Sequence, residues 1–320
     1  MTRLFVLCAI MTLSCGESLP PSALTSDSSI SLDVEADSGG SLNEVKGDTT
    51  PQSVEACPAI DLANGEHKDL YYHNIKSMPS TDGLNFDKND TILLDHASVP
   101  EGVIRPNGDV WVYFVSGQPG QHALFIAKQL ANGTLETFDC VRIDGAINGN
   151  AVDPDVVLLD DGRTRMFFFE GWFVGGKKED SHPFYSAISE DGIHFTLEHK
   201  VLEVDGGGTD PTVARLDGES WLMAIAFVDS VLLAKSEDGK TFTLTGQSLP
   251  KGIPELARFD DGLLRLYIAS REGLLIHRSE DLGQSWTEEK VVPMGGADPS
   301  LIQRGPNEWT LFYKGFSPKN

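Results

Sequence analysis

The chain has 320 residues, of which 40% are hydrophobic, and this is enough to fill the core of one large β domain or of two average domains. Its 48 acidic residues outnumber 25 basic ones, so the formal net charge is -23 at pH 7. Nucleic acids and anionic membrane surfaces attract clustered Lys and Arg, and the sequence contains no such cluster. Composition therefore excludes nucleic acid as a partner and excludes electrostatic binding to a membrane.

The first residues have the features of an export signal. Arg3 precedes an apolar run from Leu4 to Leu13, which is too short to span a bilayer as a helix. The ending TLSC resembles the bacterial lipoprotein signal, in which the cysteine becomes the lipidated first residue, although Thr12 replaces the usual Leu. We predict a signal peptide at 1–15, lipid on Cys15, and a lipid-anchored protein at the bacterial cell envelope or surface. An ordinary signal with an unmodified Cys15 is the alternative.

The next segment has the composition of a disordered tether. From residue 16 to about residue 52 it is rich in Ser, Asp, Glu, Gly and Pro and has few large apolar side chains. We place the tether at 16–67 and a single folded domain at 68–320. Contact with a membrane is then expected only through the lipid anchor.

Two cysteines remain for the folded part. Cys8 leaves with the signal and Cys15 carries lipid, which leaves Cys57 and Cys140. An even pair in an exported protein favours a disulfide, and two buried thiols are the alternative. His and Cys residues do not stand at the spacing of a structural zinc site, so we predict no metal and no cofactor.

Beyond residue 67 the chain repeats one β-rich pattern. Each copy starts with a strand beside a proline, at 100, 154, 211, 254 and 299, and these prolines lie 54, 57, 43 and 45 residues apart. A turn and an apolar strand follow in each copy: WVYFV, RMFFFEG, WLMAIAF, LRLYIAS and WTLFYKG. Short strands at this period are typical of four-stranded propeller blades.

A second phrase recurs later in each copy. It reads STDGLNF at 80–86, SEDGIHF at 189–195, SEDGKTF at 236–242 and SEDLGQSW at 279–286, and it is degraded to KQLANGTLETF in the first full copy. We interpret it as the hairpin turn between the third and fourth strands of a blade, where Asp caps the bend and Gly tolerates positive φ. The closing Phe or Trp is expected to pack between blades.

One blade is divided between the two ends of the domain. The last copy stops at Gly315 after two strands, while LYYHNIKSMPSTDGLNF, within residues 69 to 86, supplies a third and fourth strand with their turn. Joining the ends closes the ring and removes two open sheet edges. The sequence therefore predicts an all-β fold, a five-bladed β-propeller whose last blade is closed by N- and C-terminal strands.

Acidic residues gather where such a ring opens. In a propeller, the first strand of every blade starts on one face, and the loop after the second strand of every blade emerges on that same face. Around one central funnel this places the carboxylates Glu101, Asp153, Asp155, Asp210, Glu255 and Asp298, together with Glu170, Trp172, His182, Arg271 and Lys314. Like charges held close shift one another's pKa values, so acid and base forms can coexist at neutral pH.

The Pro-led strands, above all DPDVVLLDDGRTRMFFFEG, resemble those of a known superfamily of five-bladed propellers. It contains the arabinanases and xylosidases of glycoside hydrolase family 43, the invertases of family 32 and the levansucrases of family 68. The resemblance covers about residues 68–320. It implies a carbohydrate substrate of furanoside or pentoside type and three catalytic carboxylates, acting as base or nucleophile, as orienting group and as general acid.

Carried onto this chain, the resemblance implies two groups of site residues. The catalytic candidates are Asp153, Asp210, Glu255 and Glu101, and the substrate-binding candidates are Asp298, Glu170, Trp172, His182, Arg271 and Lys314. Val99 occupies the usual base position, and Gly252 the usual acid position. Glu101 and Glu255 would have to reach in from the next position, although a strand alternates faces and a shift of one residue should redirect the side chain.

Each candidate also has a structural alternative. An Asp before Pro often caps a strand end, and Glu101 and Glu255 can be solvated surface acids. Glu170 can be a polar strand end, and Trp172 can cover the blade beneath it. The basic residues Arg271 and Lys314 can neutralise the acidic funnel, and His182 can be a hydrogen-bonded structural histidine.

Three functions remain open. The first is a glycoside hydrolase. The second is a lipoprotein that binds glycan or protein without catalysis, which accounts for Val99. The third is a sialidase, because SEDLGQSW fits the Asp-box pattern S-x-D-x-G-x-x-W, although sialidases have six blades and an arginine cluster of which only Arg105 is a trace here. Asp boxes mark the turn and not the activity.

Overall fold

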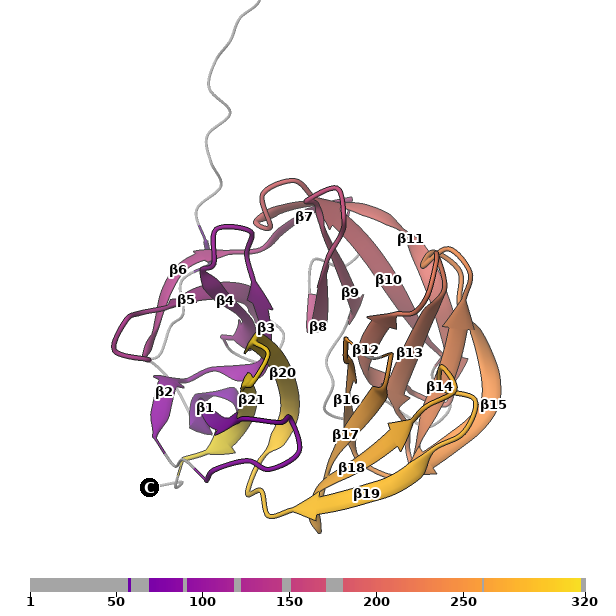
Figure 1. Ribbon diagram of the computed structural model, residues 1–320. Helices are drawn as coiled ribbons and strands as arrows, with labels where there is room; N and C mark the ends of the chain where they lie inside the picture. The colour runs from indigo at the N-terminus through magenta and orange to yellow at the C-terminus, as the bar shows by residue number, and fades with distance from the viewer. Residues whose placement is uncertain are drawn as a thin grey trace, which may run out of the picture. The chain divides into compact units, whose positions relative to one another are not determined.

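The computed structural model in Figure 1 describes residues 57–58, 69–88, 91–117, 122–145, 151–170, 181–260 and 262–317. All of them belong to the compact unit Glu55–Asn320. The predicted signal peptide with Cys15, most of the predicted tether, and Trp172 lie outside the described residues. Within the described part, none of the helical structure is long and apolar enough to cross a membrane.

Five antiparallel sheets form the five blades of a propeller, as predicted (Figure 1). The first blade holds β3 (Ser98–Ile104), β4 (Val110–Ser116), β5 (Ala123–Gln129) and β6 (Leu135–Cys140). The second holds β8 (Ala151–Leu158), β9 (Thr164–Glu170), β10 (Ser181–Ser189) and β11 (His194–Asp205). The third holds β12 (Thr209–Arg215), β13 (Trp221–Ala226), β14 (Ser230–Ser236) and β15 (Thr243–Pro250), and the fourth holds β16 (Ile253–Arg258), β17 (Leu264–Ser270), β18 (Gly273–Ser279) and β19 (Thr287–Val292).

The fifth blade joins the two ends of the domain, which confirms the prediction of a divided blade. Its strand order is β2-β1-β21-β20, where β1 is His73–Ser80, β2 is Ile92–Asp95, β20 is Ala297–Gly305 and β21 is Glu308–Phe316. The whole of β1 pairs with β21, from His73 opposite Phe316 to Ser80 opposite Trp309. This ladder closes the ring, because it ties the first described strand to the last.

Three details differ from the sequence prediction. A short 3-10 helix, η1 (Asp69–Tyr72), precedes β1, and the fourth strand of the blade begins only at Ile92, beyond the phrase assigned to it. The second blade also has a fifth strand, β7 (Arg142–Asp144), which pairs in parallel with β11. This three-residue strand follows β6 directly, so it adds a hydrogen-bonded link between the first and second blades.

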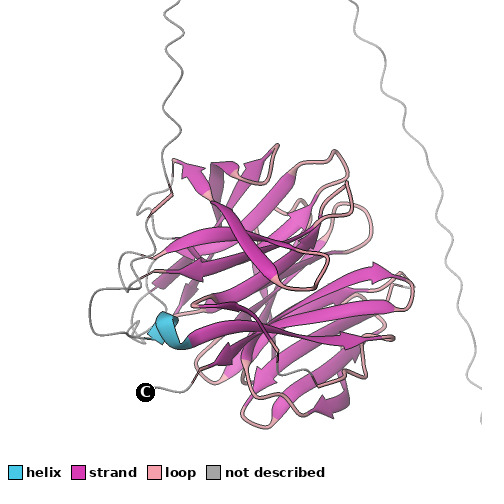
Figure 2. Cartoon of the chain, turned by 90° about the vertical axis from the view of Figure 1, so that its left-hand side faces the viewer, coloured by secondary structure: helices cyan, strands magenta, loops and turns pink. Residues whose placement is uncertain are grey.

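The hydrophobic core lies in five layers, one between each pair of neighbouring blades. Tyr113 and Phe168, for example, share the layer between the first and second blades, and Ile75, Val112 and Phe312 share the layer that closes the ring. Figure 2 shows the strands and loops of these blades from the side. Because every layer needs side chains from two blades, no blade has a core of its own.

The repeated phrases form the turns between third and fourth strands, as predicted. In the phrase of the second blade, the hydroxyl of Ser189 accepts the backbone N–H of Gly192 at 2.8 Å, and Asp191 Oδ1 accepts two further backbone N–H groups at 2.7 and 2.8 Å. The hydroxyl of Tyr113, in the first blade, donates to the carbonyl of Gly192 at 2.8 Å. Each Asp therefore holds its turn together, and the turn is fastened to the neighbouring blade.

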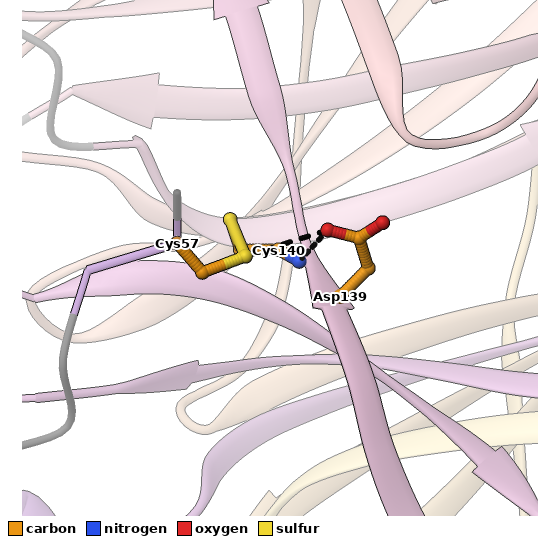
Figure 3. A group of neighbouring side chains, drawn as sticks. All are labelled: Cys57, Asp139 and Cys140. Atoms are coloured by element: carbon orange, nitrogen blue, oxygen red, sulfur yellow. Dashed lines mark hydrogen bonds between the residues drawn. A yellow bond between two sulfur atoms is a disulfide. The ribbon is translucent and has the colours of Figure 1, made fainter. Parts of the chain in front are cut away.

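A disulfide joins Cys57 to Cys140 at the end of β6, with 5.7 Å between the Cα atoms (Figure 3). The carboxylate of Asp139 lies beside it, accepts the backbone N–H of Cys140 at 2.9 Å, and forms an ion pair with Arg142 at 2.9 Å. The bond fixes the described segment before β1 to the outermost strand of the first blade.

Candidate functional site

The residue before each of the five prolines stands at the mouth of the propeller axis. Four of these residues have left-handed backbone: φ is 50° for Val99, 48° for Asp153, 49° for Asp210 and 48° for Asp298. A β-bulge or irregularity interrupts the strand pairing at each of these four positions. Positive φ is tolerated by Asp and is strained for a β-branched residue such as Val99. The fold therefore imposes this conformation, and bulges of this kind re-aim side chains next to functional sites.

The mouth cavity has a volume of about 280 Å³ and is lined by Val99, Asp153, Asp210, Asp298 and Lys314, among others. Lys314, near the end of β21, forms an ion pair with Asp298 of β20, and both side chains are buried. Burial lowers the pKa of Lys314, but the carboxylates of Asp298, Asp210 and Asp153 outweigh it and raise the pKa. The ammonium therefore stays charged beside the mouth aspartates.

The other two mouth aspartates are electrostatically different. Burial, followed by the charges of Asp210 and Asp298, raises the pKa of Asp153 well above its usual range. Burial and the charge of Asp298 raise the pKa of Asp210 to about 7. The backbone N–H of Asp210 points at Asp153 Oδ2 at 3.4 Å. A proton donor and an ion-paired carboxylate thus share one cavity near neutral pH.

The residue after each proline forms a second layer, which we call the axial belt: Glu101, Asp155, Thr212, Glu255 and Ser300. Each belt side chain accepts a backbone N–H from the next blade: Val156 to Glu101 at 3.3 Å, Val213 to Asp155, Leu256 to Thr212 at 3.0 Å, Leu301 to Glu255 at 2.8 Å and Gly102 to Ser300 at 2.9 Å. The belt is therefore a closed ring of hydrogen bonds between blades.

Three buried carboxylates crowd the belt. Oxygens of Glu101, Asp155 and Glu255 lie within 4.8 Å of one another, and Asp155 Oδ2 has no hydrogen-bond partner among the described residues. Burial and the neighbouring carboxylates raise the pKa of Glu101 well above its usual range and that of Glu255 to about 8, and burial raises that of Asp155 to about 7. The trio can share protons, and oxygen ligands of this kind can also hold a hard cation. The absence of a metal stays a prediction.

The argument that Glu101 and Glu255 would be turned away from the axis is wrong. Both line a cavity of about 30 Å³ on the axis together with Val99, Asp153 and the five prolines. Glu101 stands two residues after Val99, and residues two apart in a strand point to the same face, so alternation does not turn Glu101 away from Val99. Their place in the belt puts them one layer away from the mouth aspartates.

The remaining candidates are placed as follows. Nδ1 of His182, in β10, lies 2.8 Å from the carbonyl of Gly208, and its ring stacks on Phe169 at 5.6 Å. Glu170 ends β9 and is half-buried, and Arg271 is exposed in the turn after β17. The structure thus brings together Asp153, Asp210, Asp298 and Lys314 at the mouth, while Arg271 lines an adjoining groove.

Two sets of residues were missed from the sequence. The belt residues Thr212 and Ser300 occupy the position after the proline, and comparing the five copies at that position would have revealed them. Phe316, beside Lys314, and Lys251, just before the fourth blade, line the groove next to the mouth. Phe316 stands two residues after a predicted funnel lysine, and strand alternation is the signal that was available.

Comparison with known proteins extends the structural result. No family model and no curated protein matches the chain. Zg3597, a family 117 glycoside hydrolase of the marine bacterium Zobellia galactanivorans, superposes with a TM-score of 0.53 at 13% identity, over 78% of this chain and 92% of its own. CoXyl43, a family 43 β-xylosidase/α-arabinofuranosidase from a compost metagenome, solved with xylotriose, gives 0.51 at 16% identity, over 68% and 84%. At these identities the likeness shows a shared fold.

Proposed function

We propose that this propeller acts on glycans and hydrolyses a glycosidic bond, of furanoside or pentoside type, at the mouth of its axis. The observation that carries the proposal is the mouth itself, where Asp153, Asp210 and Asp298 surround one cavity and, among the described residues, only Asp298 forms an ion pair, with Lys314. Glycoside hydrolysis requires this pairing of a protonated carboxyl with an ionised one. The fold shared with two glycoside hydrolases supports the same class of substrate.

The chemistry assigns one role to each kind of carboxyl. The protonated pair Asp153 and Asp210 donates a proton to the glycosidic oxygen as its bond to the anomeric carbon breaks. Asp298, which is ion-paired with Lys314, accepts a proton from the water that attacks that carbon. Val99 lines the mouth where the resemblance implies the base, which is why the proposal gives that role to Asp298. Glu101 and Glu255 were predicted to be catalytic. In this proposal they lie in the belt and contribute only to the electrostatic field at the mouth.

The test is hydrolysis of aryl arabinofuranosides, xylosides, fructosides and sialosides by the full chain. We expect turnover of a furanoside or pentoside that Asp153→Asn and Asp210→Asn abolish, and that falls as pH rises above about 7, because the pKa of Asp210 is about 7. Asp161→Asn, at an exposed turn beyond β8, is the matched control and should keep full activity. Turnover that survives both mouth substitutions would disprove this site, and activity on sialosides alone would favour a sialidase.

A second candidate is a glycan-binding protein without catalysis. Val99 in the mouth and the hydrogen bonds that hold Glu101 and Glu255 in the belt favour it. A glycan array separates the two functions, since binding without turnover, lost in Asp153→Asn, would identify a binding protein.

Export and lipid anchoring through Cys15 complete the proposal and rest on the signal-like N-terminus. Metabolic labelling with a radioactive fatty acid in a bacterial host should label the full chain and leave Cys15→Ser unlabelled. Equal labelling of the two proteins would refute the anchor.

A further inference from the structure

A groove adjoins the mouth between the fourth and fifth blades. Its volume is about 920 Å³, and its lining includes Lys251, Gly252, Arg271, Met294 and Phe316. Lys251 and Gly252 also line the mouth cavity, so the two spaces meet at these residues. A ligand held at the mouth therefore has an open path outward over the seam between these two blades.

Phe316 stands at the end of this path. Its side chain is 56% exposed, the highest value among the exposed large hydrophobic residues of the described part. It lies two residues after Lys314 on β21, and the Lys314 ammonium is 5.8 Å from the centre of its ring. The imidazole of His73 meets the ring edge-on at 5.3 Å. The phenyl ring of Phe316 is thus contacted from the side by residues of β1 and β21, the two strands that close the propeller.

The rest of the groove combines exposed charged side chains with small and apolar residues. Exposed side chains of Lys251, Arg271, Glu272 and Glu288 line it, and no described residue forms an ion pair with any of them. Small residues line it next to Phe316, and a Cβ atom at Gly296 would come within 2.4 Å of the Lys314 carbonyl oxygen. A sugar ring has an apolar face of C–H groups and a rim of hydroxyls, which matches an exposed aromatic ring flanked by free charged groups.

We propose that this groove binds the sugar units beyond the one held at the mouth, with Phe316 stacking on one of them. The ligand class is therefore a linear oligosaccharide of at least two units. This inference rests on the proposed function, because it places the first unit at the mouth. The volumes agree with it: ligand sites commonly span roughly 300 to 1,000 Å³, and the mouth alone, at about 280 Å³, lies just below that range.

The test compares chain lengths. Titration calorimetry and kinetics on the full chain use arabino-, xylo- and fructo-oligosaccharides of increasing length beside the aryl monosaccharide glycosides. We expect affinity to rise from the monosaccharide to longer chains. Phe316→Ala should reduce that gain about three- to tenfold, the usual worth of an aromatic contact, while the affinity for the free monosaccharide, which places no group in the groove, stays unchanged. Phe316→Tyr keeps the aromatic face and should retain the gain.

The matched control is Phe138→Ala. Phe138 is 44% exposed on β6 and packs on Trp111 at 5.0 Å, and it does not line the groove. A gain with chain length that survives Phe316→Ala, or that is absent from the unchanged protein, would overturn the inference. The proposed function would stand in either case if Asp153→Asn still abolished activity. If no glycan binds or turns over, both fail together.

Discussion

The axial belt makes the stability of the ring depend on pH, and Glu255 is the residue through which to test this. Burial and the charge of Asp155 raise its pKa from 4.5 to about 8. The folded protein then holds a proton that the unfolded chain releases above about pH 4.5. Stability is therefore fully present below the unfolded pKa and is lost as pH rises toward 8.

The expected size follows from the shift. Between the two pKa values, one such carboxyl lowers the free energy of unfolding by about 1.4 kcal/mol per pH unit. From about pH 5 to pH 7 the share of Glu255 is about 3 kcal/mol. Glu255→Gln keeps the shape, because the amide oxygen can accept the N–H of Leu301 and the amide nitrogen can meet the hydroxyl of Thr212. Between about pH 5 and pH 7, the free energy of unfolding of the variant should therefore fall by about 3 kcal/mol less than that of the unchanged protein.

The assay is urea unfolding of the full chain at about pH 5 and pH 7, with EDTA present so that protons and not a metal ion neutralise the belt. Glu280→Gln, an exposed position, controls for the loss of one charge. The reasoning fails if the unchanged protein is as stable at pH 7 as at pH 5, or if Glu255→Gln loses stability as steeply as the unchanged protein.

Three more predictions concern stability. Cys140→Ser should lower the free energy of unfolding in urea by about 4 kcal/mol, because its disulfide links residues 83 positions apart. In the presence of reductant the variant and the unchanged protein should be equally stable, and a difference that persists there would contradict the prediction. Lys314→Met should cost about 3 to 5 kcal/mol by leaving Asp298 buried without its cation, and adding Asp298→Asn should restore most of it in a double-mutant cycle; additive costs would refute the pairing. Gly239→Ala should lower the thermal midpoint more than Gly218→Ala. The backbone strain is similar, because φ is 68° at Gly239 and 65° at Gly218, but only a Cβ added at Gly239 meets a side chain, at 2.6 Å. Equal effects of the two substitutions would rule out the contact.

The ring could be predicted because its repeats are local and regular. Each Pro-led strand, turn and apolar strand lie close together in the sequence, so the five copies can be aligned by eye. The divided blade followed from the need to cover two sheet edges. By contrast, β7 has only three residues, Arg142–Asp144, and its parallel partner lies more than fifty positions away, so no local pattern indicates it.

The sequence predicted which residues form the site, but it did not predict their backbone conformation or their ion pairing. Asp153, Asp210, Asp298 and Lys314 were all expected at the funnel, and the structure places them around one cavity. The left-handed backbone of the three aspartates could not be foreseen, because a residue before proline is normally extended. The alternation argument for Glu101 was wrong because this residue stands two positions after Val99, and not one. The pairing of Lys314 with Asp298 depends on the contact between β20 and β21, which only the closed blade fixes.

The strand β21 has a consequence for the order of events during synthesis. It is the last strand that the structure describes, it lies between β1 and β20, and it carries both Lys314 and Phe316. A chain still emerging from the ribosome has the mouth aspartates of the earlier blades but neither the cation nor the aromatic ring. A protein truncated before residue 308 would therefore have an open ring, and under the proposed function it would also fail to bind glycan.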